Sequence, residues 1–130
     1  MFKVKDIATK MVIAARPEMP IYNAIRLMAN RNITGLPVVD AELNLVGVLS
    51  EKDVLKLLYE TMDRTNQTVA DYMSTEVISL DESATLTDLC DCIVDGNLRR
   101  VPITEDDKLC AIAGRSDVIK GILMIKNQTL

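Results

Sequence analysis

Apolar residues follow two different spacings along the chain, and the same succession of spacings occurs twice. Short β-branched runs at residues 12–13 and 77–78 predict strands, and a helical three-to-four-residue spacing follows each of them. Further apolar runs at 36–39 and 45–49, and again at 101–104 and 109–113, predict two more strands per half. A second helical pattern opens near Ser50 and near Gly114. Each half is therefore predicted to run strand, helix, strand, strand, helix.

The two halves are copies of one unit. At an offset of 65 residues, Val4 falls on Val69 and Asn32 falls on Asn97. The register slips to an offset of 64 within a polar stretch after Asp40, where a turn tolerates a change of length. Beyond the slip, Asp53 falls on Asp117. Matches in one register over such a length establish an internal repeat.

The repeat determines the predicted fold class. One copy forms a sheet too small to bury its own apolar face, so two copies packed together would close the core. We expect an α+β fold in which two β-α-β-β-α repeats form one compact module with pseudo-two-fold symmetry. The first repeat is placed at residues 1–62 and the second at residues 63–130.

The ends of the first helix of each repeat have recognisable signals. Pro20 lies where the first turn of a helix tolerates proline. The sequences Asn30-Arg31-Asn32 and Asp95-Gly96-Asn97 then end these helices with residue types that accept left-handed backbone geometry.

Charge and hydropathy exclude several classes of function. The formal net charge is −4, whereas nucleic-acid binding depends on clustered Lys and Arg, so nucleic acid is an unlikely partner. No apolar run approaches the roughly 18 residues of a membrane span, and the one at residues 11–15 is too short for a signal peptide. The sequence predicts a cytoplasmic protein that does not enter a membrane.

Metal binding and catalysis also find little support. Cys90, Cys92 and Cys110 have no CxxC spacing, and the chain contains no His to complete a zinc site. We interpret them as small buried apolar residues in a reducing compartment. No nucleophile has an evident base beside it, so neither an enzyme nor a bound metal is expected.

Two sets of motifs resemble the cystathionine-β-synthase (CBS) family. The first comprises residues 33–40 (ITGLPVVD) and 46–53 (VGVLSEKD), and the second comprises residues 98–103 (LRRVPI) and 110–117 (CAIAGRSD). The segments Asp6–Thr9 and Asp71–Ser74, here called the approach segments, resemble the family's lead into the first strand. The whole chain therefore resembles a CBS pair, or Bateman module, with few residues left over.

This resemblance implies two clefts between the paired motifs for an adenosine compound such as AMP, ADP, ATP or S-adenosylmethionine. The aspartate of each Ser/Thr-x-x-Asp element would bind the ribose hydroxyls, because a carboxylate accepts hydrogen bonds from both. One cleft would be lined by Asp53, Ser50, Val48, Ser74, Ile78, Leu98, Arg99 and Arg100. The other would be lined by Asp117, Ile112, Thr9, Ile13, Ile33, Thr34 and Gly35.

The second cleft departs from the family pattern. Gly114 stands where a hydroxyl residue is usual, and Ala111 replaces the glycine found at Gly47. The cleft of Asp53 is therefore preferred, with Arg99 and Arg100 as phosphate partners. Two structural alternatives stay open: Ser50 and Asp53 also fit a helix cap, and the arginines also fit solvated charges at a strand end.

Two functions follow from the resemblance. The first is a regulatory module that senses an adenosine ligand, with no catalysis and no required cofactor. The alternative is an interaction module that forms a homodimer and regulates a partner enzyme or transporter, with no obligatory nucleotide.

Overall fold

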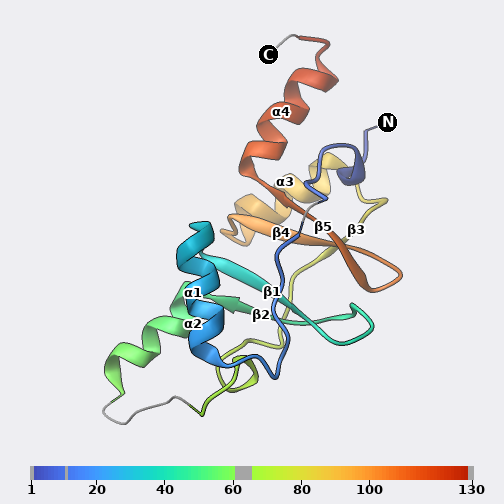
Figure 1. Ribbon diagram of the computed structural model, residues 1–130. Helices are drawn as coiled ribbons and strands as arrows, with labels where there is room; N and C mark the ends of the chain where they lie inside the picture. Colours follow the sequence, from blue (N-terminus) through green and yellow to red (C-terminus); the bar gives the residue numbers. More distant parts are fainter. Residues whose placement is uncertain (1, 11, 61–65, 129–130) are drawn as a thin grey trace. The chain divides into compact units, whose positions relative to one another are not determined.

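The computed structural model describes residues 2–10, 12–60 and 66–128, and its contacts divide the chain into two compact units. Unit 1 comprises Met1–Val12 and Ile78–Leu130, and unit 2 comprises Ile13–Val77 (Figure 1). The approach segment of each repeat therefore belongs to the unit that contains the hairpin of the other repeat. The predicted repeat boundary at residues 62 and 63 lies outside the described residues, so the repeat limits stay a prediction.

Unit 2 is built on one antiparallel hairpin. Strand β1 (Gly35–Val39) pairs with β2 (Leu45–Ser50), and helix α1 (Ile21–Arg31) precedes them. Helix α2 (Glu51–Leu55) follows β2 directly and continues into the 3-10 helix η2 (Lys56–Tyr59), and a short η3 (Val69–Asp71) leads into the approach segment. Pro20 occupies the position immediately before the first residue of α1, and Asn32 ends the helix with a left-handed φ of 54°. Both predicted helix ends are confirmed.

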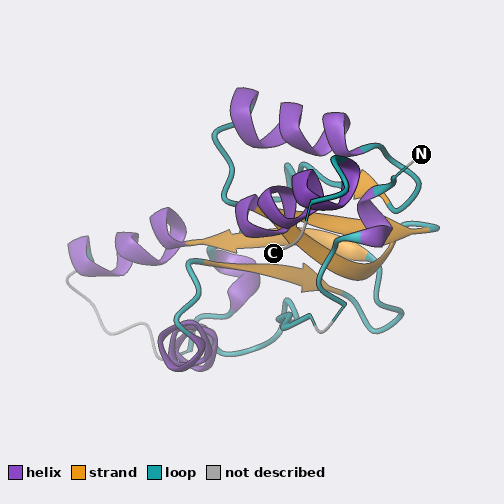
Figure 2. Ribbon diagram, turned by 90° about the horizontal axis from the view of Figure 1, so that it is seen from above, coloured by secondary structure: helices purple, strands orange, loops and turns teal. Residues whose placement is uncertain are grey.

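Unit 1 has the corresponding elements with one more strand. Its sheet has the order β3 (Leu80–Asp81), β4 (Arg100–Glu105), β5 (Lys108–Gly114), with β3 parallel to β4. Helix α3 (Leu86–Asp95) precedes β4, helix α4 (Arg115–Ile125) follows β5, and the 3-10 helix η1 (Val4–Asp6) comes from the N-terminal segment. Figure 2 distinguishes the helices from the strands by colour. The α+β class and both hairpins are confirmed.

The predicted first strand of each repeat was misplaced. Residues 12–13 and 77–78 form no strand, and the extended pairing occurs two to three residues later along the chain. In unit 1 it is β3, and in unit 2 it is a single parallel bridge between Ala15 and Val38. The β-branched runs instead belong to the connections that lead into this pairing.

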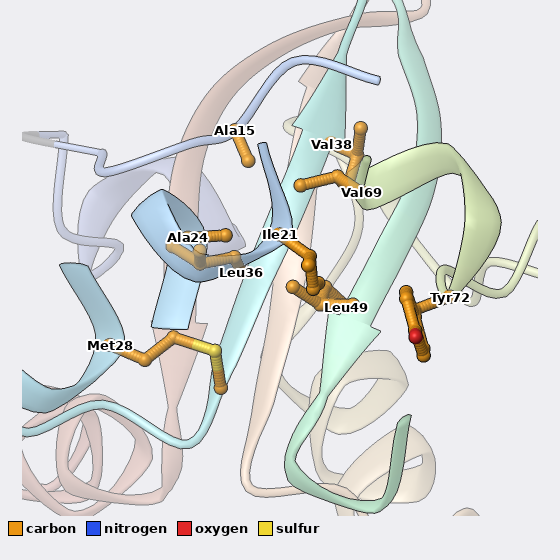
Figure 3. Close-up of a cluster of buried hydrophobic side chains, with 9 residues drawn as sticks. All are labelled: Ala15, Ile21, Ala24, Met28, Leu36, Val38, Leu49, Val69 and Tyr72. Carbon is orange, nitrogen blue, oxygen red and sulfur yellow. The ribbon is translucent and has the colours of Figure 1, made fainter. Parts of the chain in front are cut away.

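Each unit has its own buried apolar cluster. In unit 2 the side chains of α1, β1, β2 and η3 meet, as Figure 3 shows. The cluster consists of Ala15, Ile21, Ala24, Met28, Leu36, Val38, Leu49, Val69 and Tyr72. In unit 1 it consists of Val4, Leu86, Leu89, Ile93, Val101, Ile103, Ala111 and Ala113. Val4 and Val69 occupy equivalent positions two residues before the approach segments, so one fully buried valine anchors the chain ahead of each segment.

The cysteine interpretation was partly wrong. All three are free thiols, but Cys90 is exposed, whereas Cys92 and Cys110 are half-buried. On α3 the neighbouring Leu89 takes the buried position, and this turns Cys90 toward solvent. The helical spacing of apolar residues included both Leu89 and Cys90, and only packing decides which of the two lies at the edge of the apolar face.

Candidate functional site

Each approach segment pairs with the second strand of a hairpin. In unit 2, Val48 and Ser74 exchange two backbone hydrogen bonds, each 2.9 Å long. In unit 1, Thr9 and Ile112 do the same at 2.8 and 2.9 Å. The structure therefore brings together Val48 with Ser74, and Ile112 with Thr9, as the two predicted residue sets require.

Gly47 permits the close approach in unit 2. A Cβ atom built at this position would lie 2.9 Å from the carbonyl oxygen of Ser74 and 2.9 Å from the sulfur of Met73. Ala111 occupies the equivalent position in unit 1, where it is buried. The backbone bonds of the two approach segments nonetheless have nearly the same length, so unit 1 accommodates a Cβ atom where unit 2 has a glycine.

Ser50 and Asp53 form a reciprocal cap at the start of α2. The backbone N–H of Ser50 donates to Oδ2 of Asp53 at 2.8 Å, and the Ser50 hydroxyl donates to the same oxygen at 2.9 Å. The backbone N–H of Asp53 returns a longer bond of 3.4 Å to the Ser50 hydroxyl. The predicted capping role is confirmed. Among the described residues, Oδ1 of Asp53 accepts no hydrogen bond.

Asp117 is bound differently at the start of α4. Its Oδ2 accepts the backbone N–H of Gly114 at 2.8 Å, which repeats the cap without a hydroxyl. Its Oδ1 accepts the hydroxyl of Thr9 at 3.4 Å. In unit 2 the equivalent hydroxyl of Ser74 turns away and accepts the backbone N–H of Glu76. Both oxygens of Asp117 are therefore engaged, whereas one oxygen of Asp53 is not.

The remaining predicted residues lie in two places. In unit 2, Gly35 is paired with Ser50, and the carbonyl of Thr34 accepts the N–H of Glu51 at 2.9 Å. Ile13 and Ile33 pack against the edge of the same core. In unit 1, Arg100 is paired with Gly114, the carbonyl of Leu98 accepts Nε of Arg115 at 3.3 Å, and Ile78 is exposed.

The residues predicted for each cleft are divided between the two units. Of the preferred set, Val48, Ser50, Asp53 and Ser74 belong to unit 2, and Ile78, Leu98, Arg99 and Arg100 belong to unit 1. Of the other set, Thr9, Ile112 and Asp117 belong to unit 1, and Ile13, Ile33, Thr34 and Gly35 belong to unit 2.

Charge near these residues is unevenly compensated. Arg99 and Arg100 are exposed, and the ion pair formed within the described ranges joins Arg16 and Glu18, so neither arginine has a carboxylate partner there. The contact of Arg115 with Leu98 could not be predicted from the sequence, because it joins residues that are distant along the chain.

The described residues contain no cluster of His, Cys, Asp and Glu suited to a metal, and none of their helices has the length and apolar character of a membrane span.

A model of the CBS domain matches the chain twice, over residues 4–60 and 69–124. The chain belongs to the CBS domain family. These two matches cover the motifs in both units, including both Asp-containing helix starts.

Several proteins are similar over most of the chain. The CBS domain-containing protein YhcV of Bacillus subtilis is 32% identical over 91% of this chain and 84% of its own length. The protein MJ1225 of Methanocaldococcus jannaschii is 29% identical over 90% of this chain. The chloroplastic protein CBSX2 of Arabidopsis thaliana is 28% identical over 88%. The chain spans only 41% of MJ1225 and 60% of CBSX2.

Solved CBS-pair structures have the same fold and include complexes with adenosine compounds. The structure of CBSX2 in complex with AMP has a TM-score of 0.83 and 29% identity, covering 97% of this chain and 99% of that one. The CBS domain pair of protein MJ0100, in complex with 5′-methylthioadenosine and S-adenosylmethionine, has a TM-score of 0.78 and 27% identity. It covers 97% of this chain and 98% of that one.

Proposed function

We propose that this CBS protein is a regulatory module that binds an adenosine-containing ligand and catalyses no reaction. The observation that carries the proposal is the carboxylate of Asp53, which is fixed at the start of α2 through one oxygen while the other stays available. The AMP and S-adenosylmethionine complexes of similar CBS pairs support an adenosine compound as the ligand class.

Asp53 has the chemistry for ribose recognition. The two bonds from Ser50 hold the carboxylate in one orientation, so Oδ1 is already positioned before a ligand arrives. An ionised carboxylate makes stronger hydrogen bonds than a neutral acceptor, and vicinal hydroxyls offer two donors. We assign the ribose to Asp53, with Ser50 beside it and Val48 and Ser74 forming the adjoining backbone edge.

The other assignments follow the chemistry of the remaining residues. Arg99 and Arg100 of unit 1 are the phosphate partners, since both are exposed cations without a carboxylate partner among the described residues. Ile78 and Leu98 supply apolar contacts to the base. The Asp117 set binds more weakly, because a ribose there must displace the hydroxyl of Thr9 and finds no hydroxyl at Gly114.

Calorimetric titration against AMP, ADP, ATP and S-adenosylmethionine tests the proposal directly. We expect a saturable heat of binding with one of the four. Absence of heat from all four at millimolar concentration would overturn the adenosine proposal. No cofactor or metal is required in this scheme, so the result should not change after dialysis against a chelator. A cytoplasmic location accords with this role.

The phosphate assignment has its own test. The double variant R99A/R100A should weaken AMP binding by about tenfold, because two charge-assisted contacts are lost. Its affinity for adenosine, which has no phosphate, should change little. The control K3A/K5A removes two exposed cations at the N-terminal segment. An equal loss of affinity for AMP and adenosine would show that the arginines act only on structure.

A second candidate function is an interaction module that forms a homodimer and regulates a partner enzyme or transporter. Apolar side chains on two helical elements favour it: Ile119 on α4 is 63% exposed, and Leu58 and Tyr59 on η2 are 80% and 86% exposed. Exposed apolar surface of this kind marks interfaces. Sedimentation equilibrium should show a dimer, and a monomer at every concentration would remove this candidate.

A further inference from the structure

Helices α1 and α3 occupy the same position in the two repeats but differ in the charge of their exposed faces. At the repeat offset of 65 residues, Asn23, Arg26 and Asn30 of α1 correspond to Asp88, Asp91 and Asp95 of α3. All six residues are exposed. Their spacing of three and four residues places each trio along one face of its helix. This face is cationic on α1 and strongly anionic on α3.

No basic residue of α3 and no acidic residue of α1 offsets these charges, as the two sequences show. Arg26 donates to Oδ1 of Asn23 at 2.9 Å, which leaves its charge uncompensated. Asp88 accepts the N–H of Thr85, but Asp91 and Asp95 form no ion pair with any described residue. Each face therefore keeps its charge available for a partner.

An apolar side chain also interrupts the anionic face. Val94 lies between Asp91 and Asp95 and is 70% exposed. Helix α3 packs beside α4, whose Ile119 and Ile122 are 63% and 51% exposed. Charged residues surrounding exposed aliphatic ones are typical of a protein interface, where the charges select the partner and its orientation.

We propose that a second copy of this chain binds these helices so that α1 of one copy faces α3 of the other. This inference rests on the homodimer proposed above and adds its orientation. In a two-fold dimer the contact occurs twice, because each copy contributes both faces. Arg26 then lies opposite Asp91 of the second copy in both contacts.

The alternative orientation is unfavourable for a definite reason. If α3 faced α3, three aspartates of each copy would lie opposite three of the other, and like charges across an interface are repelled. Two α1 helices would bring Arg26 close to its own counterpart. Only the mixed contact places each Arg26 opposite a carboxylate and keeps the two aspartate trios apart, so the unequal repeats select one orientation.

A charge-exchange experiment tests the orientation. We would measure the dimer dissociation constant by sedimentation equilibrium at low salt for R26D, D91R and the double variant R26D/D91R. Each single variant should weaken the dimer by roughly tenfold or more, because it places like charges in both contacts. The double variant restores opposite charges and should return to within a few-fold of the original value. High salt should reduce all of these differences, because ions screen exposed charges.

Matched controls separate the contact from net charge and folding. Lys5 and Glu76 are exposed and lie outside all four α-helices, so K5D and E76R reproduce the two charge changes elsewhere. We expect both controls to dimerise like the original chain. Circular dichroism melting should show all variants folded, since every substituted side chain is exposed.

Three results would overturn the inference in distinguishable ways. A dimer that is unaffected by R26D and D91R, or a double variant weaker than either single one, would show that α1 does not face α3. A dimer strengthened by D91R would place α3 against α3. A chain that is monomeric throughout would remove the dimer itself, and the calorimetric test of ligand binding would be unaffected.

Discussion

Replacing Asp53 by asparagine separates the two roles assigned to this carboxylate. Asparagine keeps an oxygen that accepts hydrogen bonds from Ser50, but it removes the negative charge. In the structure the Oδ2 atom accepts two bonds, of 2.8 and 2.9 Å. Bonds to a charged acceptor contribute about 1.5–3 kcal/mol, against about 0.5–1.5 kcal/mol for neutral ones. The favourable interaction of a carboxylate with a helix start adds about 0.3–1 kcal/mol.

The expected loss of stability is therefore modest. Asp53 is only half-buried, so solvent screens part of the difference, and we expect D53N to lower the free energy of unfolding by about 1 kcal/mol. That corresponds to a decrease of a few degrees in Tm for a chain of this size. The effect on AMP binding should be larger, about ten- to a hundredfold in Kd, because the ribose loses its charged acceptor.

Asp71 provides the matched control. It accepts the backbone N–H of Thr68 at 2.8 Å and the Thr68 hydroxyl at 3.3 Å, which is the same cap in the same unit without an assigned ligand role. D71N should cost similar stability and leave AMP affinity unchanged. Thermal melting and calorimetry with AMP measure both quantities. Two results would refute the ribose role of Asp53: D53N binding AMP as well as the original chain, or D71N losing as much affinity as D53N.

Three further predictions concern packing, pH and thiol reactivity. G47A should lower stability by about 1–3 kcal/mol, because its Cβ would lie 2.9 Å from a backbone oxygen of the approach segment. G35A, whose nearest contact would be 3.7 Å, should melt close to the original chain, and equal melting of the two would contradict this account. Hydrogen bonds from the backbone and then the side chain of Thr85 lower the pKa of the Asp88 carboxyl. These bonds therefore stabilise the fold at pH values above the unfolded-state pKa, and their contribution is lost as the pH falls below about 4. Urea midpoints between pH 6 and 2 should therefore vary less in D88N, and identical pH profiles would count against this assignment. In dilute protein, iodoacetamide should modify the exposed Cys90 before Cys92, because burial and then neighbouring aspartates raise the pKa of the Cys92 thiol. Peptide mass spectrometry measures the order of modification, and the reverse order would refute this prediction.

The parts of the fold that depend on neighbouring residues could be predicted from the sequence. The left-handed helix end at Asn32 has a φ of 54°, and the cap of Ser50 by Asp53 joins residues three apart. Hairpins connected by short turns are local in the same sense, so β1–β2 and β4–β5 were found within one residue at most of their ends. Local propensity and hydrophobic spacing are sufficient for these features.

Contacts between distant segments could be predicted only where the repeat and the family resemblance indicated them. These placed Thr9 with Ile112, but they gave no information on the hydroxyl of Thr9, which reaches an oxygen of Asp117 across 108 residues of sequence. The exposure of Cys90 and the position of β3 were likewise decided by packing against other elements.

The sequence by itself thus determined the repeated α+β unit and the residue types at each helix start, because these arise from short-range hydrogen bonds and periodic burial. The tertiary structure alone decided which carboxylate keeps an available oxygen. Asp53 and Asp117 are the same residue in equivalent positions, and their difference arises from the hydroxyl of a distant approach segment, which is turned toward Asp117 in unit 1 and away from Asp53 in unit 2.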